Sequence, residues 1–150
     1  MNIFSIYLEK IRNFLIDLEK NKKIILSDNL SNLTIELTPK NLQGDISCNA
    51  ALVLSKKNNK KPKDIASLLK KNLIKKFSEF KNIYIAEPGF LNIEFKEDFW
   101  QNFLTNLLNL KGKYGSSFPE KKNYNVEFVS ANPTGPLHVG HCRGAVLGDV

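Results

Sequence analysis

Residues 82–95, NIYIAEPGFLNIEF, predict two short β-strands joined by a turn. Pro88 and Gly89 separate the two apolar runs, and both residue types favour tight turns. From Leu91 to Phe95, apolar residues alternate with polar ones. Because successive side chains of a strand point to opposite faces, the apolar residues share one face. The stretch therefore predicts a hairpin of a small antiparallel sheet, with one face on a core.

Segments with helical periodicity surround this hairpin. Residues 3–18 and 62–77 carry apolar side chains at steps of three and four, which is typical of helices that bury one face. Residues 33–37 predict a further strand, and residues 49–57 predict a short helix. A third apolar stripe after the hairpin consists of Phe99, Trp100, Phe103, Leu104, Leu107 and Leu108, preceded by Glu97 and Asp98 at the positive end of the helix. We expect all three stripes, aromatic residues included, to lie in the core.

The order of these segments predicts two domains. Residues 1–110 form an α+β domain, a small antiparallel sheet with helices. Residues 111–123, KGKYGSSFPEKKN, lack periodicity and are rich in Gly, Ser, Pro and Lys, which indicates a linker. Residues 124–150 then predict a buried strand at 126–129 and a helix starting at His138. This order is that of the first strand and helix of an α/β domain.

Composition narrows the class of partner. The formal charge is +7, and nine of the twenty lysines lie between Lys56 and Lys76 with Asp64 as the only acidic residue there. Such a segment favours an anionic partner, although the general excess of lysine over arginine leaves nucleic-acid binding open. The apolar runs are too short to cross a bilayer, so we expect a cytoplasmic protein. Cys48 and Cys142 lie far apart, which predicts free reduced thiols.

The loop SANPTGPLHVGH, residues 130–141, carries the chemistry of the second domain. Its prolines and glycines make it stiff, and it follows a predicted strand, where α/β domains bind ligands. His138 and His141 share one face of the first helical turn, where the backbone N–H groups attract phosphates. Gly140 leaves room for a flat ring such as adenine. Two alternatives stay open. The histidines could only cap the helix, or they could bind a metal together with Cys142 or a carboxylate, which is disfavoured because neither is a clear third ligand.

The motif is long enough to be compared with known protein families. VEFVSANPTGPLHVGHCRGAVLGDV, residues 126–150, closely resembles the first signature region of arginyl-tRNA synthetases, the HIGH-type motif of class I aminoacyl-tRNA synthetases. GDISCNAALVLSKK, residues 44–57, and AEPGFLNIEF, residues 86–95, look like that family's additional N-terminal domain, an α+β module that contacts the elbow of the tRNA. The resemblance implies that residues 124–150 begin a Rossmann-type class I catalytic domain.

The resemblance also implies a role for each polar residue of the motif. Glu127 matches the carboxylate that pairs with the guanidinium of arginine, although a solvent-facing role is the alternative. Ser130 and Asn132 match groups that hold the amino acid. His138 and His141 match the catalytic pair facing the ATP phosphates, with His141 also near arginine, and Gly140 matches the adenine platform. The signature loop comprises Ala131, Asn132, Pro133, Thr134, Gly135, Pro136, Leu137, His138, Val139, Gly140 and His141.

The implied reaction has two steps. Arginine attacks the α-phosphate of ATP, bound with Mg²⁺ as a substrate, and the terminal ribose of tRNA(Arg) then attacks the arginyl-adenylate. No protein-bound metal is predicted, and we expect a monomer. The residues expected to contact tRNA are Lys56, Lys57, Lys60, Lys61 and Lys63. We expect the chain to be the N-terminal part of a longer enzyme and inactive by itself; the alternatives are a free-standing basic RNA-binding module and a structural domain whose lysines keep it soluble.

Overall fold

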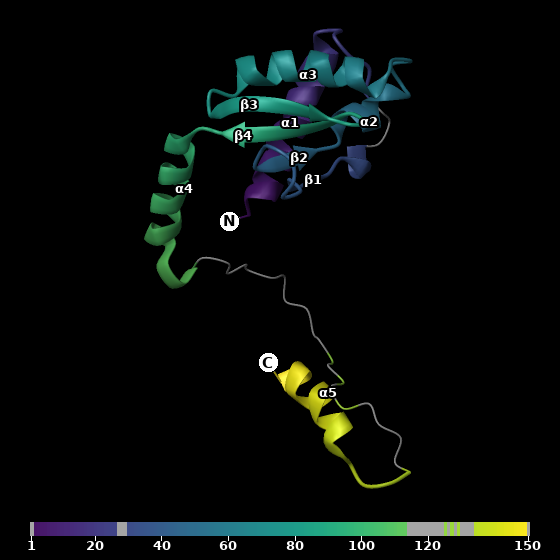
Figure 1. Cartoon of the computed structure of the whole chain (residues 1–150), viewed down its shortest axis with the longest axis vertical. Helices are drawn as coiled ribbons and strands as arrows, with labels where there is room; N and C mark the ends of the chain where they lie inside the picture. Colours follow the sequence, from purple (N-terminus) through teal and green to yellow (C-terminus); the bar gives the residue numbers. More distant parts are fainter. Residues whose placement is uncertain are drawn as a thin grey trace. The chain divides into compact units, whose positions relative to one another are not determined.

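The chain forms two compact units, Met1–Gly115 and Ser116–Val150, here called the N-terminal and C-terminal units. The computed structural model describes residues 2–26, 30–113, 125, 127, 129 and 134–149 (Figure 1). The units are described separately. Among the described residues, none of the helices has the length and apolar character required to cross a membrane.

A four-stranded antiparallel sheet organises the N-terminal unit, as the hairpin predicted. Its strands are β1 (Ile35–Leu37), β2 (Ile46–Cys48), β3 (Phe80–Ala86) and β4 (Phe90–Phe95), in the order β1-β2-β4-β3. Tyr84 pairs with Asn92 across the hairpin, and Cys48 pairs with Leu91 on the other side of β4. The expected strand at 33–37 is confirmed as β1, whereas the sequence did not predict β2. The inner strands are therefore β2 and β4, with β1 and β3 at the edges of the sheet.

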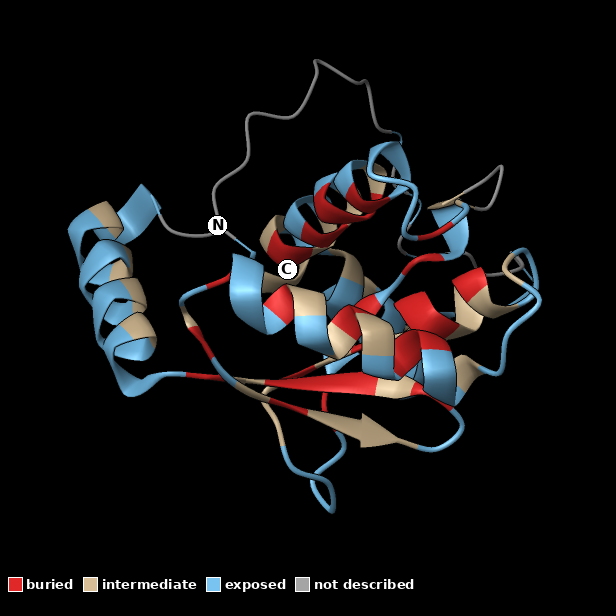
Figure 2. Ribbon diagram, turned by 90° about the horizontal axis from the view of Figure 1, so that it is seen from above, coloured by how far each residue is buried: buried red, intermediate tan, exposed pale blue. Residues whose placement is uncertain are grey.

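Three helices cover one face of this sheet (Figure 2). They are α1 (Ile3–Lys20), α2 (Ala50–Ser55) and α3 (Pro62–Lys76), and a short 3₁₀ turn, η1 (Leu30–Asn32), precedes β1. The predicted apolar faces of α1 and α3 are confirmed, since their buried residues include Ile11, Leu15, Leu69 and Leu73. These side chains meet the alternate residues of β2, β3 and β4. Three pairs of aromatic rings in the core have centroids 4.8 to 5.9 Å apart: Tyr7 with Phe80, Tyr7 with Phe95, and Phe14 with Phe77.

The helix after the hairpin departs from expectation. It forms as α4 (Glu97–Leu110), with Glu97 and Asp98 in its first turn, but none of its residues is buried. Phe99 stacks on Phe95 at 4.3 Å between ring centroids, whereas Leu104 and Leu108 are 55% and 64% exposed. The prediction that the whole stripe is core was wrong, because only the first turn of α4 reaches the end of the sheet. Periodicity shows that a helix has an apolar face, not that a neighbour covers it.

One helix, α5 (Val139–Asp149), is the regular element described in the C-terminal unit. The predicted helix start at His138 is confirmed. The expected strand is not seen at Glu127 or Val129, which are exposed and in no strand; residues 126 and 128 lie outside the described residues. A strand needs a neighbouring strand to pair its backbone, and the described part of this unit contains none. Of the predicted linker, only η2 (Lys111–Lys113) is described.

Candidate functional site

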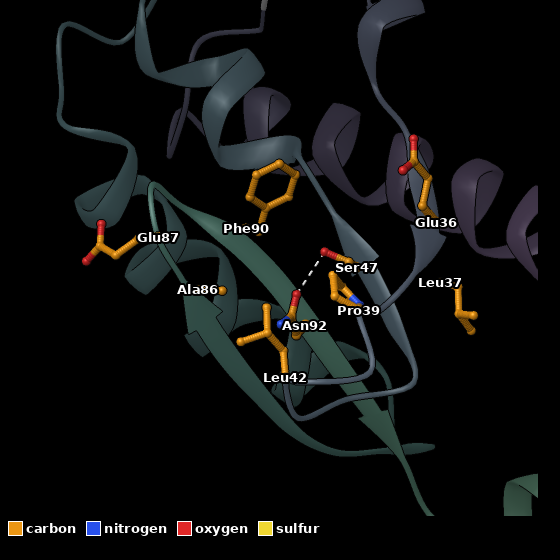
Figure 3. Close-up of a pocket in the computed structure, with 9 residues that line it drawn as sticks. All are labelled: Glu36, Leu37, Pro39, Leu42, Ser47, Ala86, Glu87, Phe90 and Asn92. Carbon is orange, nitrogen blue, oxygen red and sulfur yellow. Dashed lines mark hydrogen bonds between the residues drawn. The ribbon is translucent and has the colours of Figure 1, made fainter.

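A hollow of about 240 Å³ lies on the face of the sheet opposite the helices. Side chains alternate along β4: Leu91 and Ile93 lie in the core, so Phe90 and Asn92 point to this opposite face. Figure 3 shows the lining residues, which come from all four strands, the turn after β3 and the loop between β1 and β2: Glu36, Leu37, Pro39, Leu42, Ser47, Ala86, Glu87, Phe90 and Asn92.

Asn92 is the polar centre of this hollow. Its side chain is only 2% exposed, and its Oδ1 accepts a hydrogen bond of 2.8 Å from the hydroxyl of Ser47. Gly44 supports it from behind: at φ +114°, a Cβ on Gly44 would lie 3.0 Å from the Cβ of Asn92. Within the described part of the chain, no residue accepts a hydrogen bond from Asn92 Nδ2. The amide is therefore held in place with a donor to spare.

The walls of the hollow suit a flat ring. Phe90 is half-buried and supplies an aromatic face, while Pro39 and Leu42 supply apolar surface (Figure 3). A planar ligand could stack on Phe90 and present a polar edge to Asn92. This site was not predicted from the sequence. The available signal was Asn92, which with Glu94 is one of the two polar residues of β4.

The predicted tRNA-contacting lysines lie near the same end of the sheet. Lys63, in the first turn of α3, pairs with Glu87 at 3.2 Å, and Glu87 lines the hollow. A Cβ on Gly89 would lie 2.7 Å from the Cβ of Pro62, so the start of α3 packs directly on the turn between β3 and β4. The other four predicted lysines are exposed in the connection before α3: Lys56, Lys57, Lys60 and Lys61. Their role in binding stays a prediction.

His138 and His141 cap the first turn of α5 reciprocally. The N–H of Gly140 donates to Nδ1 of His138 at 3.1 Å, and the N–H of His138 donates to Nδ1 of His141 at 3.1 Å. The ring centroids lie 4.0 Å apart. This arrangement resembles a capping box. The side chain of the N-cap residue accepts a hydrogen bond from an N–H of the first helical turn, and the side chain of the third helical residue accepts one from the N–H of the N-cap residue. The capping alternative is thus part of the observed geometry.

The capping bonds leave one nitrogen of each ring for other partners. Nδ1 of each imidazole accepts a backbone N–H, so Nε2 is the ring nitrogen that can donate. Neither Nε2 atom bonds another residue in the described ranges, which leaves two N–H donors. They border a mostly apolar hollow of about 420 Å³, whose lining residues are Val129, Leu137, His138, Val139, His141, Cys142 and Ala145.

The structure describes part of the rest of the predicted catalytic site. Glu127 is exposed, as its alternative reading required. Ser130, Ala131, Asn132 and Pro133 lie outside the described residues. A Cβ on Gly140 would lie 2.9 Å from Cε1 of His138, so an imidazole covers the predicted adenine platform. The described part of the chain contains no group of three or more residues able to hold a metal ion.

The ionisable groups with shifted pKa values that lie in the N-terminal unit contribute to its packing. Burial raises the pKa of the Cys48 thiol to about 12, and both cysteines are free. Burial opposes ionisation of Glu79, but a backbone hydrogen bond and bonds from Lys10 at 2.9 Å and Tyr7 at 3.0 Å hold its pKa below the ordinary range. Burial and the Glu79 carboxylate together raise the pKa of Tyr7. These contacts tie α1 to the residue preceding β3.

Comparisons with known proteins agree with this arrangement. The family described as "Arginyl tRNA synthetase N terminal domain" matches residues 6–95. The arginine-tRNA ligase of Pelagibacter ubique (strain HTCC1062) is 47% identical over 151 residues, and that of Brucella ovis is 41% identical; each alignment covers 100% of this chain and 26% of the relative. The chain thus spans about a quarter of the length of these relatives.

A solved structure supports the fold. The Thermus thermophilus arginyl-tRNA synthetase aligns with a TM-score of 0.57 and 24% identity, over 99% of this chain and 22% of that one. At this identity the likeness concerns the fold alone. The family match is independent of it and covers well over half of the chain, including the whole four-stranded sheet. The chain therefore belongs to the family of arginyl-tRNA synthetase N-terminal domains.

Proposed function

We propose that this chain is the N-terminal part of an arginine-tRNA ligase, which activates L-arginine with ATP and transfers it to tRNA(Arg). The observation that carries the proposal is the alignment of the entire chain, family domain and HIGH-type motif together, with arginine-tRNA ligases at up to 47% identity. The motif lies outside the matched domain of residues 6–95, so the alignment joins two separate signals.

In this proposal the N-terminal unit binds tRNA. The hollow at Phe90 and Asn92 accepts an unstacked nucleobase, which stacks on the ring of Phe90 and bonds to the spare amide donor of Asn92. Stacking and hydrogen bonding need different side chains, and β4 supplies both within three residues, at Phe90 and Asn92. The lysines at the start of α3 neutralise phosphates on either side of that base.

The C-terminal unit supplies the first part of the catalytic site of a Rossmann-type domain. The free Nε2–H groups of His138 and His141 donate to oxygens of ATP, which enters with Mg²⁺ as a substrate, and stabilise charge as pyrophosphate leaves. As donors through Nε2, the histidines need not act as bases. Glu127 pairs with the arginine guanidinium, and Ser130 and Asn132 hold its amino-acid end.

A chimera tests the proposal. The matching region of the Pelagibacter ubique ligase is replaced by this chain, and arginylation of tRNA(Arg) is measured. We expect activity that falls at least about 100-fold when both histidines are replaced by alanine. The isolated chain should bind tRNA(Arg) with equal affinity in the presence and absence of ATP and arginine. A folded chimera without arginylation, together with an isolated chain that still binds RNA, would identify an RNA-binding module instead.

A further inference from the structure

A second groove runs along α3 on the helix-covered side of the sheet. It has a volume of about 550 Å³ and is lined by Ser67, Lys70, Lys71, Ile74 and Lys75 of α3 and by Ile85 of β3. The hollow at Asn92 does not share any of these residues. Its lysines belong to the basic segment from Lys56 to Lys76, but they lie beyond Lys63, the last residue that was expected to contact tRNA.

The lysines of this groove differ from the other lysines of α3. Lys63 pairs with Glu87 at 3.2 Å, and Lys76 lies 4.0 Å from Asp17. For the three lysines between them, the described residues provide no carboxylate within 4.0 Å: Lys70, Lys71 and Lys75. Lys71 and Lys75 are four residues apart on one helix face, a spacing at which like charges repel. An anionic partner would remove this repulsion.

The floor of the groove is apolar. Ile74 is 38% exposed and Ile85 is partly buried at the edge of the sheet. The aliphatic stems of lysines pack on such surfaces while the ammonium groups reach outward. The hydroxyl of Ser67 donates to the carbonyl of Lys63 at 2.9 Å, so its oxygen remains available as an acceptor. The result is an apolar channel bordered by three positive charges.

The groove and the hollow meet at one edge of the sheet. Ile85 lines the groove, and the next residue, Ala86, lines the hollow. Because neighbouring side chains of a strand point to opposite faces, the two sites open on opposite sides of edge strand β3. A single polymer that crosses this edge can occupy both sites.

We propose that the α3–β3 groove binds the phosphodiester backbone of the RNA whose base occupies the hollow at Asn92. This proposal rests on the proposed function, because it assumes that the polymer is tRNA. The charges suit phosphates, and the shared edge strand explains how one RNA reaches both faces. The groove supplies affinity without reading sequence, whereas the hollow reads a base.

Two matched double variants test the groove. Lys71→Gln with Lys75→Gln removes two unpaired charges, and Lys76→Gln with Lys81→Gln removes two charges that have carboxylate partners in Asp17 and Glu94. Both change the net charge equally, and glutamine retains the helix propensity of lysine. Binding of the whole chain to tRNA(Arg) is measured between 50 and 200 mM salt.

We expect the groove variant to lower the slope of log affinity against log salt by about 1.5, as for two lost phosphate contacts, and the control to change it by less than about 0.5. Equal losses in the two variants, or an unchanged slope in the groove variant, would overturn the proposal while leaving tRNA binding intact. Displacement of tRNA by polyglutamate as effectively as by unlabelled RNA would show a protein partner instead. Failure of the unmodified chain to bind tRNA would instead reject the proposed function, and the groove with it.

Discussion

The two units of this chain differ in which residues determine their structure. The N-terminal unit has a continuous core from α1 to β4, in which residues such as Ile11 and Ile93 are completely buried. The C-terminal unit holds the most specific motif of the sequence, yet its helix α5 has no buried residue. A motif and a core are thus separate properties. The geometry of His138 and His141 needs only one helical turn, whereas the sheet needs residues far apart in the chain.

The largest effect on stability should come from shortening a side chain of the core. Ile93→Ala removes a fully buried side chain from the inner strand β4 and should lower the free energy of unfolding by about 2–5 kcal/mol. Leu104→Ala, on the exposed stripe of α4, should cost far less. Chemical denaturation followed by circular dichroism measures both. If the Ile93 substitution also shifted the NMR signals of the histidines of α5, the two units would not be independent.

The next effect concerns the hollow. Phe90→Ala should weaken tRNA(Arg) binding by about 1–3 kcal/mol, because a stacking platform is lost. Asn92→Ala should weaken it too and also alter which base at the bound position is preferred. Leu108→Ala, an exposed apolar residue of α4, is the control. Titration of labelled tRNA measures all three, and equal affinities for the Phe90 variant and the control would remove the hollow from the RNA interface.

A smaller effect depends on pH. The folded-state pKa of Glu79 is depressed, so its stabilising contribution is present above the unfolded value of about 4.3 and is lost as the pH falls through the folded value. Glu79→Gln should therefore cost about 1.5 kcal/mol at pH 7 and progressively less below about pH 4. Unfolding curves from pH 3 to pH 7 measure this. A constant difference over that range would contradict the assigned charge.

The smallest effect concerns the histidine caps. The chain has two histidines, so their ¹⁵N spectra are simple to assign, and at pH 8 both should show the tautomer with hydrogen on Nε2. His138→Ala should destabilise α5 by about 1 kcal/mol, while His138→Asn, a favoured N-cap, should restore it. A proton on Nδ1 of either ring would show that the reciprocal caps are absent.

The sequence predicted the elements better than it predicted their burial. The periodicity of α1 and α3 and the Pro-Gly turn of the hairpin were sufficient, because these signals are local. The stripe of α4 was assigned to the core although none of it is buried and half of it is exposed, since an amphipathic pattern does not identify a partner. The hollow at Asn92 was missed because its walls come from segments more than fifty residues apart, such as Glu36 and Phe90.

By itself, the sequence determined the family, the antiparallel hairpin and the helix that begins after His138, because a motif, a turn and a period are properties of neighbouring residues. Tertiary structure decided the rest. Packing of Gly44 and Ser47 against β4 gave Asn92 its orientation, and the position of β3 at the edge of the sheet placed Ile85 and Ala86 in different sites. It also separated the lysines of α3 into paired and unpaired groups, because the carboxylates that neutralise Lys63 and Lys76 belong to other elements.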